Sequence, residues 1–202
     1  MGIILAIKWV NIATKTSKEA LRKISKHYPH RDVSNLSGVR IAEHEAVICC
    51  LEELLGSGDW WIEHELNGAP VLFKNGINCE IEISISHAIE NNTVAYAAVI
   101  LGDSDIGNNS RIGVDLVIKG DKRIGRISQR VMRQEEIDSG RLEEVWACKE
   151  AMFKALGPGL DFIKDLEVNF ISEDLISGND RKWRVINQEN VVVVYGPVPV
   201  SF

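Results

Sequence analysis

Residues 80–86 have the sequence Glu-Ile-Glu-Ile-Ser-Ile-Ser, in which polar residues alternate with isoleucine. Successive side chains of a strand point to opposite faces of its sheet, so this period of two predicts a strand with one buried face. Residues 93–101 are rich in Val, Ala and Ile and predict another strand. We therefore expect the middle of the chain to contribute to a half-buried sheet.

The segments before these strands predict two helices and further strands. The helices are expected at 18–27 and 39–55, where apolar residues recur at helical spacing. Ser17 or Thr16 is the expected cap of the first helix, and Gly56 is the stop signal of the second. The expected strands are 3–10, 60–65 and 71–74, although 60–65 could instead end a helix.

The segments after them also mix helices with strands, without a regular βαβ repeat. Helices are expected at 124–137 and 142–156, and the expected strands are 112–117, 166–171, 183–186 and 191–195. This order favours an α+β fold with largely antiparallel sheets. The polar, glycine-containing segment 102–110 is the expected junction between two α+β halves, 1–105 and 106–202.

The composition excludes several classes of protein. The chain has 202 residues, 45% of them hydrophobic, and a net charge of −6, which is typical of a folded protein and disfavours general nucleic-acid binding. No apolar run reaches about 18 residues, and Lys8 interrupts the apolar start, so we expect neither a membrane span nor a signal peptide. We also expect the protein to be a cytoplasmic monomer. The four cysteines form no Cys-x-x-Cys pair and are interpreted as small buried residues.

Two segments of the second half contain polar groups that point to chemistry. Asp115 stands among apolar strand residues, just after Gly113-Val114, and a buried carboxylate needs a cation, a metal or several donors. An aspartate that caps a strand end is the alternative. Trp146, Glu150 and Lys154 are four residues apart, on one helical face. If Trp146 faces the core, Glu150 is expected to point inward as well; otherwise Glu150 and Lys154 form a simple surface pair.

The third such segment is Ser84-Ile85-Ser86-His87, which is expected to end its strand. Ser86 and His87 would then lie where the strand opens into a loop, a usual place for phosphate or substrate contacts. A solvent-exposed histidine at a strand end is the alternative interpretation.

Together the segments give the pattern Ser-His, Gly-x-Asp and Trp-x-x-Lys-Glu-Ala-x-x-Lys, at Ser86, Gly113 and Trp146. This pattern resembles the 4'-phosphopantetheinyl transferase superfamily, from about residue 68 to residue 166. The chain length is similar to that of its longer, monomeric branch, in which two α+β halves pack as a pseudo-dimer. The resemblance implies an enzyme of the holo-[acyl-carrier-protein] synthase type. It would transfer the phosphopantetheine arm of coenzyme A to a serine of an apo carrier protein and release adenosine 3',5'-bisphosphate.

The resemblance also implies roles for individual residues. Asp115 and Glu150 would hold Mg²⁺, or Mn²⁺, because hard cations prefer carboxylate and phosphate oxygens. Glu150, or a water that it orients, would take the proton of the carrier serine, and Lys154 would neutralise phosphate charge. The implied contacts to coenzyme A are Arg40, Gly68, Pro70, Ser86, His87, Lys149 and Lys154, although Lys149 could equally be a solvated neighbour.

The chain departs from the family pattern at Val117, Ala69 and Ile48. The longer branch usually has an acid at the first of these positions, a lysine at the second and, by a rough alignment, an arginine at the third. All three departures weaken metal or coenzyme A binding. They motivate the alternative of a weakened or inactive member that binds a carrier protein or coenzyme A without transfer.

Residues 118–133 form a basic segment in this acidic chain. Arg123, Arg126 and Arg130 are spaced to share one helical face, where they would bind an acidic carrier protein, unless the face is simply solvated. Outside the transferase family, a binding module or a purely structural α+β domain remain the competing interpretations. A nuclease built on Asp115 and Glu150 is disfavoured by the net charge.

Overall fold

The computed structural model describes residues 2–12, 17–103 and 111–198 and divides into two compact units, Met1–Ser104 and Asp105–Phe202. Both units combine helices with antiparallel sheets, which confirms the predicted α+β class. Thr16 and most of the expected junction at 102–110 lie outside the described residues. The boundary between the halves therefore stays a prediction.

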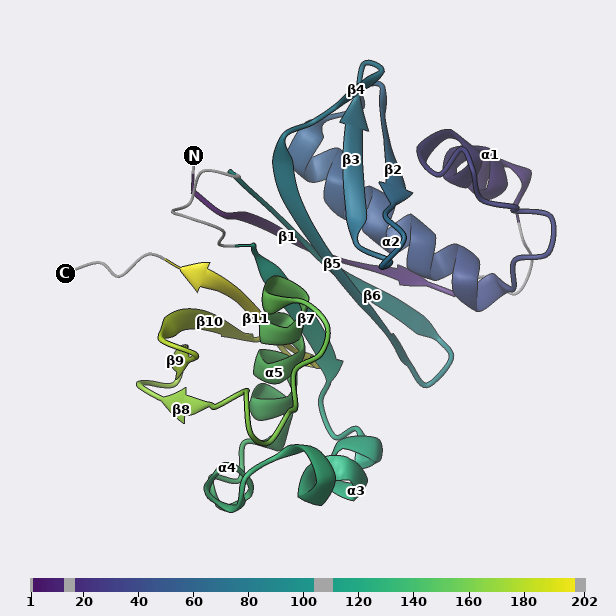
Figure 1. Ribbon diagram of the computed structural model, residues 1–202. Helices are drawn as coiled ribbons and strands as arrows, with labels where there is room; N and C mark the ends of the chain where they lie inside the picture. The colour runs from purple at the N-terminus through teal and green to yellow at the C-terminus, as the bar shows by residue number, and fades with distance from the viewer. Residues whose placement is uncertain (1, 13–16, 104–110, 199–202) are drawn as a thin grey trace. The chain divides into compact units, whose positions relative to one another are not determined.

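The described part of the N-terminal unit contains a long helix, a short helix and two three-stranded sheets (Figure 1). Its elements are β1 (Ile4–Asn11), α1 (Lys18–His27), α2 (Gly38–Leu55), β2 (Trp60–His64), β3 (Pro70–Lys74), β4 (Ile77–Asn78), β5 (Ile81–Glu90) and β6 (Val94–Asp103). The strand orders are β1-β6-β5 and β2-β3-β4. The Ser17 hydroxyl accepts a hydrogen bond from Ala20 N at 2.9 Å, which identifies Ser17 as the cap of α1.

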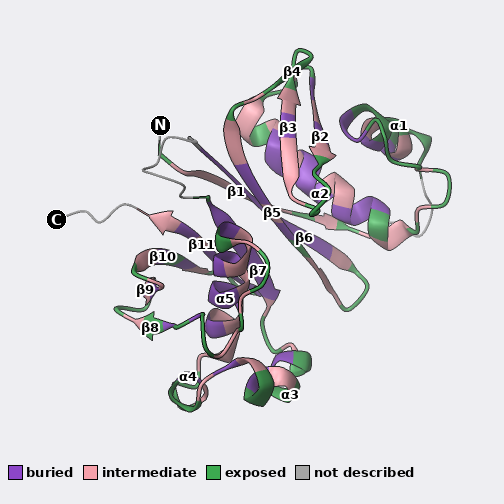
Figure 2. Cartoon of the chain, in the orientation of Figure 1, coloured by how far each residue is buried: buried purple, intermediate pink, exposed green. Residues whose placement is uncertain are grey.

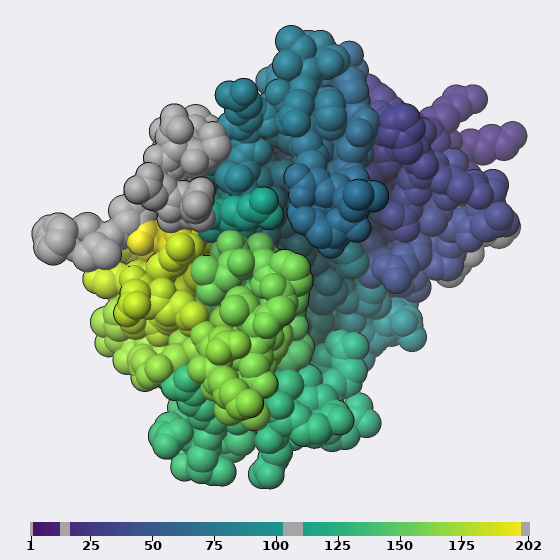
Figure 3. Space-filling view, in the orientation of Figure 1, coloured from purple at the N-terminus to yellow at the C-terminus, as the bar shows by residue number. Residues whose placement is uncertain are grey.

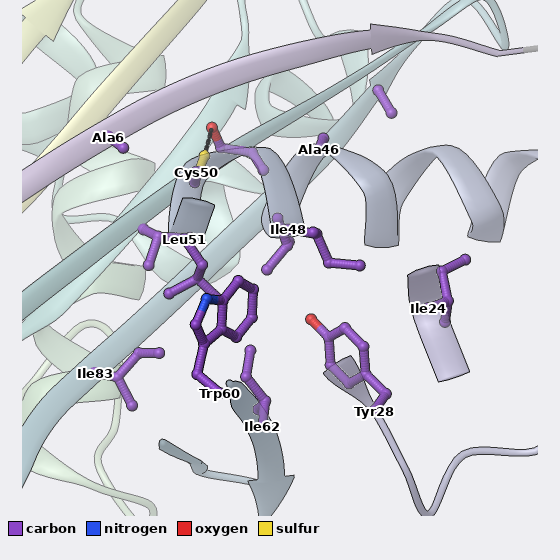
Figure 4. Close-up of a cluster of buried hydrophobic side chains, with 14 of the residues drawn as sticks. Ala6, Ile24, Tyr28, Ala46, Ile48, Cys50, Leu51, Trp60, Ile62 and Ile83 are labelled. Atoms are coloured by element: carbon purple, nitrogen blue, oxygen red, sulfur yellow. Dashed lines mark hydrogen bonds between the residues drawn. The ribbon is translucent and has the colours of Figure 1, made fainter. Parts of the chain in front are cut away.

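The core of this unit lies between α2 and one face of the β1-β6-β5 sheet. Ile83 of β5 belongs to this core, and Ile81 and Ile85 pack against it, as their period of two predicted. The prediction that only one face of this strand is buried is wrong, because Ser84 and Ser86 on the opposite face are buried as well. Figure 2 shows buried residues concentrated in β6 and along α2. Figure 4 shows the indole of Trp60 among the side chains around α2. Trp60 is fully buried and its Nε1 donates a hydrogen bond to Gly56 O at 3.0 Å, so the large aromatic leaves no unpaired donor.

The C-terminal unit places a long helix against a five-stranded sheet. Its elements are β7 (Gly113–Ile118), α3 (Lys122–Val131), α4 (Gln134–Asp138), α5 (Leu142–Leu156), β8 (Asn169–Phe170), β9 (Leu175–Gly178), β10 (Arg181–Asn187) and β11 (Val191–Val198). The strand order is β7-β11-β10-β9-β8. Residues of α5, β7, β10 and β11 form its core, which includes fully buried Trp183.

The two units repeat one topology. In each, the first strand pairs antiparallel with the last, and the last pairs antiparallel with the strand before it, giving β1-β6-β5 and β7-β11-β10. In each, the longest helix contributes to the core that covers this sheet. The repeat agrees with the expectation of two similar halves, although the sequence shows no clear repeat. Packing of the halves as a pseudo-dimer stays a prediction.

Three local predictions are wrong. The helix expected at 124–137 is two helices, since the chain is extended at Met132, and this break lets Glu136 enter the protein interior. The strand expected at 166–171 is only β8, and β9 was not predicted because its short segment lacks a clear apolar period. β5 continues to Glu90, so Ser86 and His87 lie within a strand and not at its end.

The cysteine prediction is only partly met. All four cysteines are free, with Cys50 and Cys148 buried and Cys49 and Cys79 half-buried. Burial raises the pKa of Cys50 to about 12, so this thiol stays protonated at neutral pH. The two buried thiols behave as small hydrophobic residues.

Candidate functional site

A close crossing of β7 and α5 positions the polar residues of the C-terminal unit. At Gly113, a Cβ atom would lie 1.9 Å from Ala151 O and 3.2 Å from Ala155 N, so any other residue would collide with the helix backbone. Glycine therefore lets α5 touch the strand directly. Glu150 and Lys154 follow one another by one turn of this helix, and Asp115 is two residues beyond the glycine on the same strand face.

Asp115, Glu150 and Lys154 form a cluster at this crossing, which we call the Asp115 cluster. Lys154 Nζ donates to Asp115 Oδ1 and to Val114 O, each at 2.8 Å. The Asp115 residue is only 7% exposed, so its charge needs this partner. Glu150 is half-buried; burial, and then the nearby charge of Asp115, raise the pKa of its carboxyl, while Lys154 opposes the shift. The three predicted residues are thus brought together.

The donor set of the Asp115 cluster suits a hard divalent cation. Burial and then the charge of Asp115 raise the pKa of the Glu150 carboxyl, and a cation between the two carboxylates would relieve their mutual repulsion. No group of three or more His, Cys, Asp or Glu side chains suitable for a metal occurs in the described parts of the chain. A cation here would take its remaining ligands from water and from ligand oxygens, as Mg²⁺ commonly does.

Val117 occupies the position where the longer family branch usually has an acid. Its side chain is 5% exposed and belongs to the core beneath α5. An acid at this position would have to be buried beside apolar groups, at a high desolvation cost. The apolar residue therefore serves the packing of α5 on the sheet.

Lys149 is not available as a contact for coenzyme A, so this prediction is wrong. Its side chain is fully buried and its Nζ lies 2.7 Å from Glu136 Oε2. The ammonium also donates to the carbonyl oxygens of Phe162 and Leu166. Glu136 in turn accepts a hydrogen bond from Val168 N at 3.0 Å. This buried pair connects α4 and α5 with the segment that leads to β8, and the sequence showed only a lysine beside the expected metal ligand.

Trp146 is half-buried, which only partly meets the expectation that it faces the core. Its ring stacks on Phe162 at a centroid distance of 5.7 Å, and Phe153 packs on the same ring at 5.6 Å. Glu150, on the same helical stripe, is half-buried as well. The stripe therefore lies at the edge of the core, where a carboxylate is partly desolvated and still accessible.

The N-terminal unit contains a pocket of about 200 Å³ beside α2, which we call the α2 pocket. Four of the predicted coenzyme A contacts line it: Arg40, Gly68, Pro70 and His87. Further polar lining residues were not predicted: Arg31, Glu43, His44 and His64. They were missed because they come from separate segments and form no motif. Helical spacing of Arg40, Glu43, His44 and Val47 was a usable signal for one wall.

Glu43 organises one side of the α2 pocket. Arg40 Nη1 donates to Glu43 Oε2 at 2.8 Å, and His87 Nδ1 lies 3.2 Å from Glu43 Oε1. His44 is half-buried and packs against Tyr28, with ring centroids 4.7 Å apart. Burial, together with the neighbouring Arg31, His87, Arg40 and His64, lowers the pKa of His44 to about 4. The pocket is therefore lined by two arginines and three titratable histidines, and the nearby positive charge disfavours protonation of His44.

Two residues of the prediction are placed elsewhere in this unit. Ser86 is buried and lies on the face of β5 opposite to the isoleucines. His87 lies on the same face as the isoleucines, the face that packs against α2. Ser86 therefore does not line the α2 pocket. Ile48 is fully buried in the core, so an arginine could not reach the pocket from there. Arg40 lines the pocket instead.

The basic segment forms the exposed helix α3. Arg123, Arg126 and Arg130 are all exposed. Asp121 caps the helix and pairs with Arg123, whose Nη2 lies 2.6 Å from Asp121 Oδ2. In the space-filling view α3 lies at the surface of the C-terminal unit, at its lower edge (Figure 3).

Comparison with protein-family models matches residues 111–192 to the 4'-phosphopantetheinyl transferase superfamily. The matched segment contains all three residues of the Asp115 cluster and the arginines of α3. No curated protein matches the chain. Within the described residues, no helix is both long and apolar enough to cross a membrane.

Proposed function

We propose that the chain, whose residues 111–192 match the 4'-phosphopantetheinyl transferase superfamily, is a member of that family and transfers the phosphopantetheine arm of coenzyme A to a serine of an apo acyl or peptidyl carrier protein. The family supports phosphopantetheinyl transfer in general, with coenzyme A and a carrier protein as partners. The observation that carries the proposal is the Asp115 cluster, in which Gly113 brings two carboxylates and a lysine to one crossing.

The chemistry needs a base, a cation and a way to offset negative charge. The serine oxygen attacks the phosphorus that bears pantetheine, the bond from this phosphorus to the bridging oxygen breaks, and adenosine 3',5'-bisphosphate leaves. Glu150, or a water that it orients, accepts the serine proton; the raised pKa of Glu150 makes it a stronger base than a free carboxylate. Lys154 already contacts Asp115 and would offset phosphate charge.

Asp115 and Glu150 would hold Mg²⁺, with Mn²⁺ as a possible substitute. When bound, the cation supplies electrostatic stabilisation to phosphate oxygens. The two carboxylates provide only part of a ligand shell, so we expect coenzyme A phosphates and water to complete it.

The α2 pocket is the proposed site for the nucleotide part of coenzyme A. Arg40 supplies a cationic group to it and His87 a titratable one, and Gly68 and Pro70 also line it. A surplus of positive charge favours an anionic ligand over a neutral one. For the carrier protein, the exposed arginines of α3 form a surface that suits an acidic partner.

The second candidate is a family member that binds coenzyme A or a carrier protein without transfer. It rests on Val117, which leaves the cluster without a third acid, and on Ala69, which leaves the pocket rim without a lysine. Both would weaken catalysis, but neither removes a residue of the Asp115 cluster.

The deciding experiment is a transfer assay with the purified chain, coenzyme A and apo carrier proteins of several classes, read by intact mass. We expect a mass gain of one phosphopantetheine arm that requires Mg²⁺ and is lost in Glu150→Gln. A folded wild-type protein that modifies no carrier protein would contradict the proposal and favour the binding-only relative.

A further inference from the structure

A buried carboxylate lines the α2 pocket, although this pocket is the proposed site for an anion. Glu43 is 8% exposed and lines the pocket together with Arg40 and His87. A negative charge close to a phosphate weakens its binding through direct repulsion. We therefore expect Glu43 to contribute something that offsets this repulsion.

Glu43 contacts Arg40 and His87 through different oxygens. Arg40 Nη1 donates a hydrogen bond to Glu43 Oε2 at 2.8 Å, and His87 Nδ1 lies 3.2 Å from Glu43 Oε1. Arg40 precedes Glu43 by three residues on α2, whereas His87 belongs to β5, which packs against α2. One buried side chain therefore connects a residue of the helix with a residue of the strand.

The three side chains differ in how far packing fixes them. The side chain of Glu43 is 11% exposed, whereas those of Arg40 and His87 are 57% and 40% exposed. An exposed arginine has many rotamers, and a ligand that binds it must fix one of them at a cost in entropy. A hydrogen bond to a buried carboxylate reduces this cost before the ligand arrives.

The contact with Glu43 still leaves Arg40 able to bind a ligand. A guanidinium has five N–H donors in a planar fork, so one donation to Glu43 leaves other donors for an anion. Arg31 lines the same pocket, so two arginines face the one carboxylate. The pocket therefore keeps a surplus of positive charge while Glu43 orders part of it.

We propose that Glu43 is a positioning residue, which holds Arg40 and His87 in the orientation that receives the anionic nucleotide of coenzyme A. The inference rests on the proposed function for the identity of this ligand. It makes a prediction whose sign is opposite to that of simple repulsion. If Glu43 only repelled the ligand and occupied Arg40, loss of its charge would strengthen anion binding; as a positioning residue, its loss weakens binding although the pocket becomes more positive.

Titration of the full chain with adenosine 3',5'-bisphosphate tests this sign by calorimetry near neutral pH. Glu43→Gln keeps the size of the side chain but removes its charge, and an amide cannot accept hydrogen bonds at both ends. We expect the Kd to rise about tenfold. Glu45→Gln is the matched control, because Glu45 is a half-buried carboxylate of the same helix that does not line the pocket. Its Kd should equal that of the wild type.

A double-mutant cycle shows whether Glu43 acts through its partner. When Arg40→Gln is already present, Glu43→Gln should raise the Kd by a smaller factor than it does in the wild type. A general loosening of the fold would raise the Kd by the same factor in both backgrounds. In the transfer assay, Glu43→Gln should raise the KM for coenzyme A and leave kcat unchanged, because it does not alter the Asp115 cluster.

Equal or tighter nucleotide binding by Glu43→Gln would overturn the inference, as would equal factors in the cycle or the absence of binding by the wild type. If Glu43→Gln does not fold, nitrogen NMR of the His87 ring in the wild type replaces it. We expect a proton on Nδ1, and a Nδ1 without a proton would overturn the inference because it could not donate to Glu43.

The same measurements separate this inference from the proposed function. Transfer with an unchanged KM for coenzyme A in Glu43→Gln would defeat the inference alone. Weaker nucleotide binding by Glu43→Gln, in a wild-type protein that modifies no carrier protein, would defeat only the proposed function.

Discussion

Single residues decide whether the Asp115 cluster exists. Gly113 allows α5 to contact β7, and Asp115 accepts a hydrogen bond from Lys154. Lys149 forms a buried ion pair with Glu136 of α4. These roles differ. The absence of a side chain at Gly113 allows close packing, Asp115 and Lys154 would take part in the reaction, and buried Lys149 stabilises the fold. Substitutions at these positions should therefore separate activity from folding.

Gly113→Ala should disrupt the cluster through backbone collision. The new Cβ would meet Ala151 O at 1.9 Å, and a backbone atom of a packed helix cannot move aside cheaply. We expect a loss of at least about 1–3 kcal/mol in the free energy of unfolding, together with most of the transfer activity. Urea unfolding and the transfer assay measure the two effects.

Gly125→Ala is the matched control for this substitution. Gly125 lies within α3, and a Cβ there meets no atom within 4 Å. Alanine favours the helix over glycine by about 0.5–1 kcal/mol, so the free energy of unfolding should stay unchanged or rise. A similar loss in both variants would show that the crossing at Gly113 is not special.

Lys149→Met should destabilise the C-terminal unit strongly. It leaves Glu136 as a buried carboxylate without its partner, which commonly costs about 3–5 kcal/mol. Lys23→Met, which breaks the partly exposed pair with Glu52, should cost less than about 1 kcal/mol. Urea unfolding of both variants compares the pairs, and a silent Lys149→Met would contradict the buried role.

Glu150→Gln should remove the response to the cation without unfolding the protein. Gln keeps the shape of the side chain and removes a charge that burial and Asp115 already disfavour. We expect Mg²⁺ to raise the melting temperature of the wild type but not that of the variant, and transfer to be lost. An unchanged Mg²⁺ effect in the variant would show that Glu150 is not a ligand of the cation.

At the scale of elements, α3 and α2 present charged faces of different kinds. The arginines of α3 are exposed and do not line the α2 pocket, whereas Arg40 and His44 of α2 do. An exposed face suits a protein partner, and a cavity suits a small molecule. The break between α3 and α4 also belongs to this scale, because it lets Glu136 reach Lys149.

Reversal of charge on α3 should affect only the carrier protein. Arg126→Glu combined with Arg130→Glu should raise the apparent KM for the carrier several-fold, more at low salt, and leave the apparent KM for coenzyme A unchanged. Arg22→Glu, at an exposed position of α1, is the control and should change neither value. Equal changes in both KM values for the α3 variant would exclude a docking role.

At the scale of the whole molecule, the proposed sites belong to two different units. The α2 pocket lies in Met1–Ser104, and the Asp115 cluster lies in Asp105–Phe202. Each unit has its own core and repeats the same strand order, with its own long helix. A ligand that binds one unit should therefore protect mainly the elements of that unit.

Hydrogen exchange can test this division. Adenosine 3',5'-bisphosphate without a cation should slow exchange mainly in α2 and β5, which line the pocket. Mg²⁺ alone should slow exchange mainly in β7 and α5, although its weaker binding will give a smaller effect. Protection by the nucleotide that is confined to β7 and α5 would contradict the assignment of the α2 pocket.

The sequence by itself determined the elements with strong periods and the residues of the Asp115 cluster. Alternation in 80–86 predicted a strand, and helical spacing in 39–55 and 142–156 predicted helices. These patterns are local, and the structure has the predicted elements at these places. The spacing of Asp115, Glu150 and Lys154 belongs to a motif, and the structure brings these residues together.

Only the tertiary structure decided the burial of Lys149, the continuation of β5 beyond His87, and the α2 pocket. Lys149 and Glu150 are neighbours in sequence, yet the helix turns one into the core and leaves the other at its edge. Arg31, His44 and His64 come from segments that meet only when α2 packs on its sheets. Contacts between distant segments leave no local pattern, and burial depends on what packs against a residue, so neither could be inferred from neighbouring residues alone.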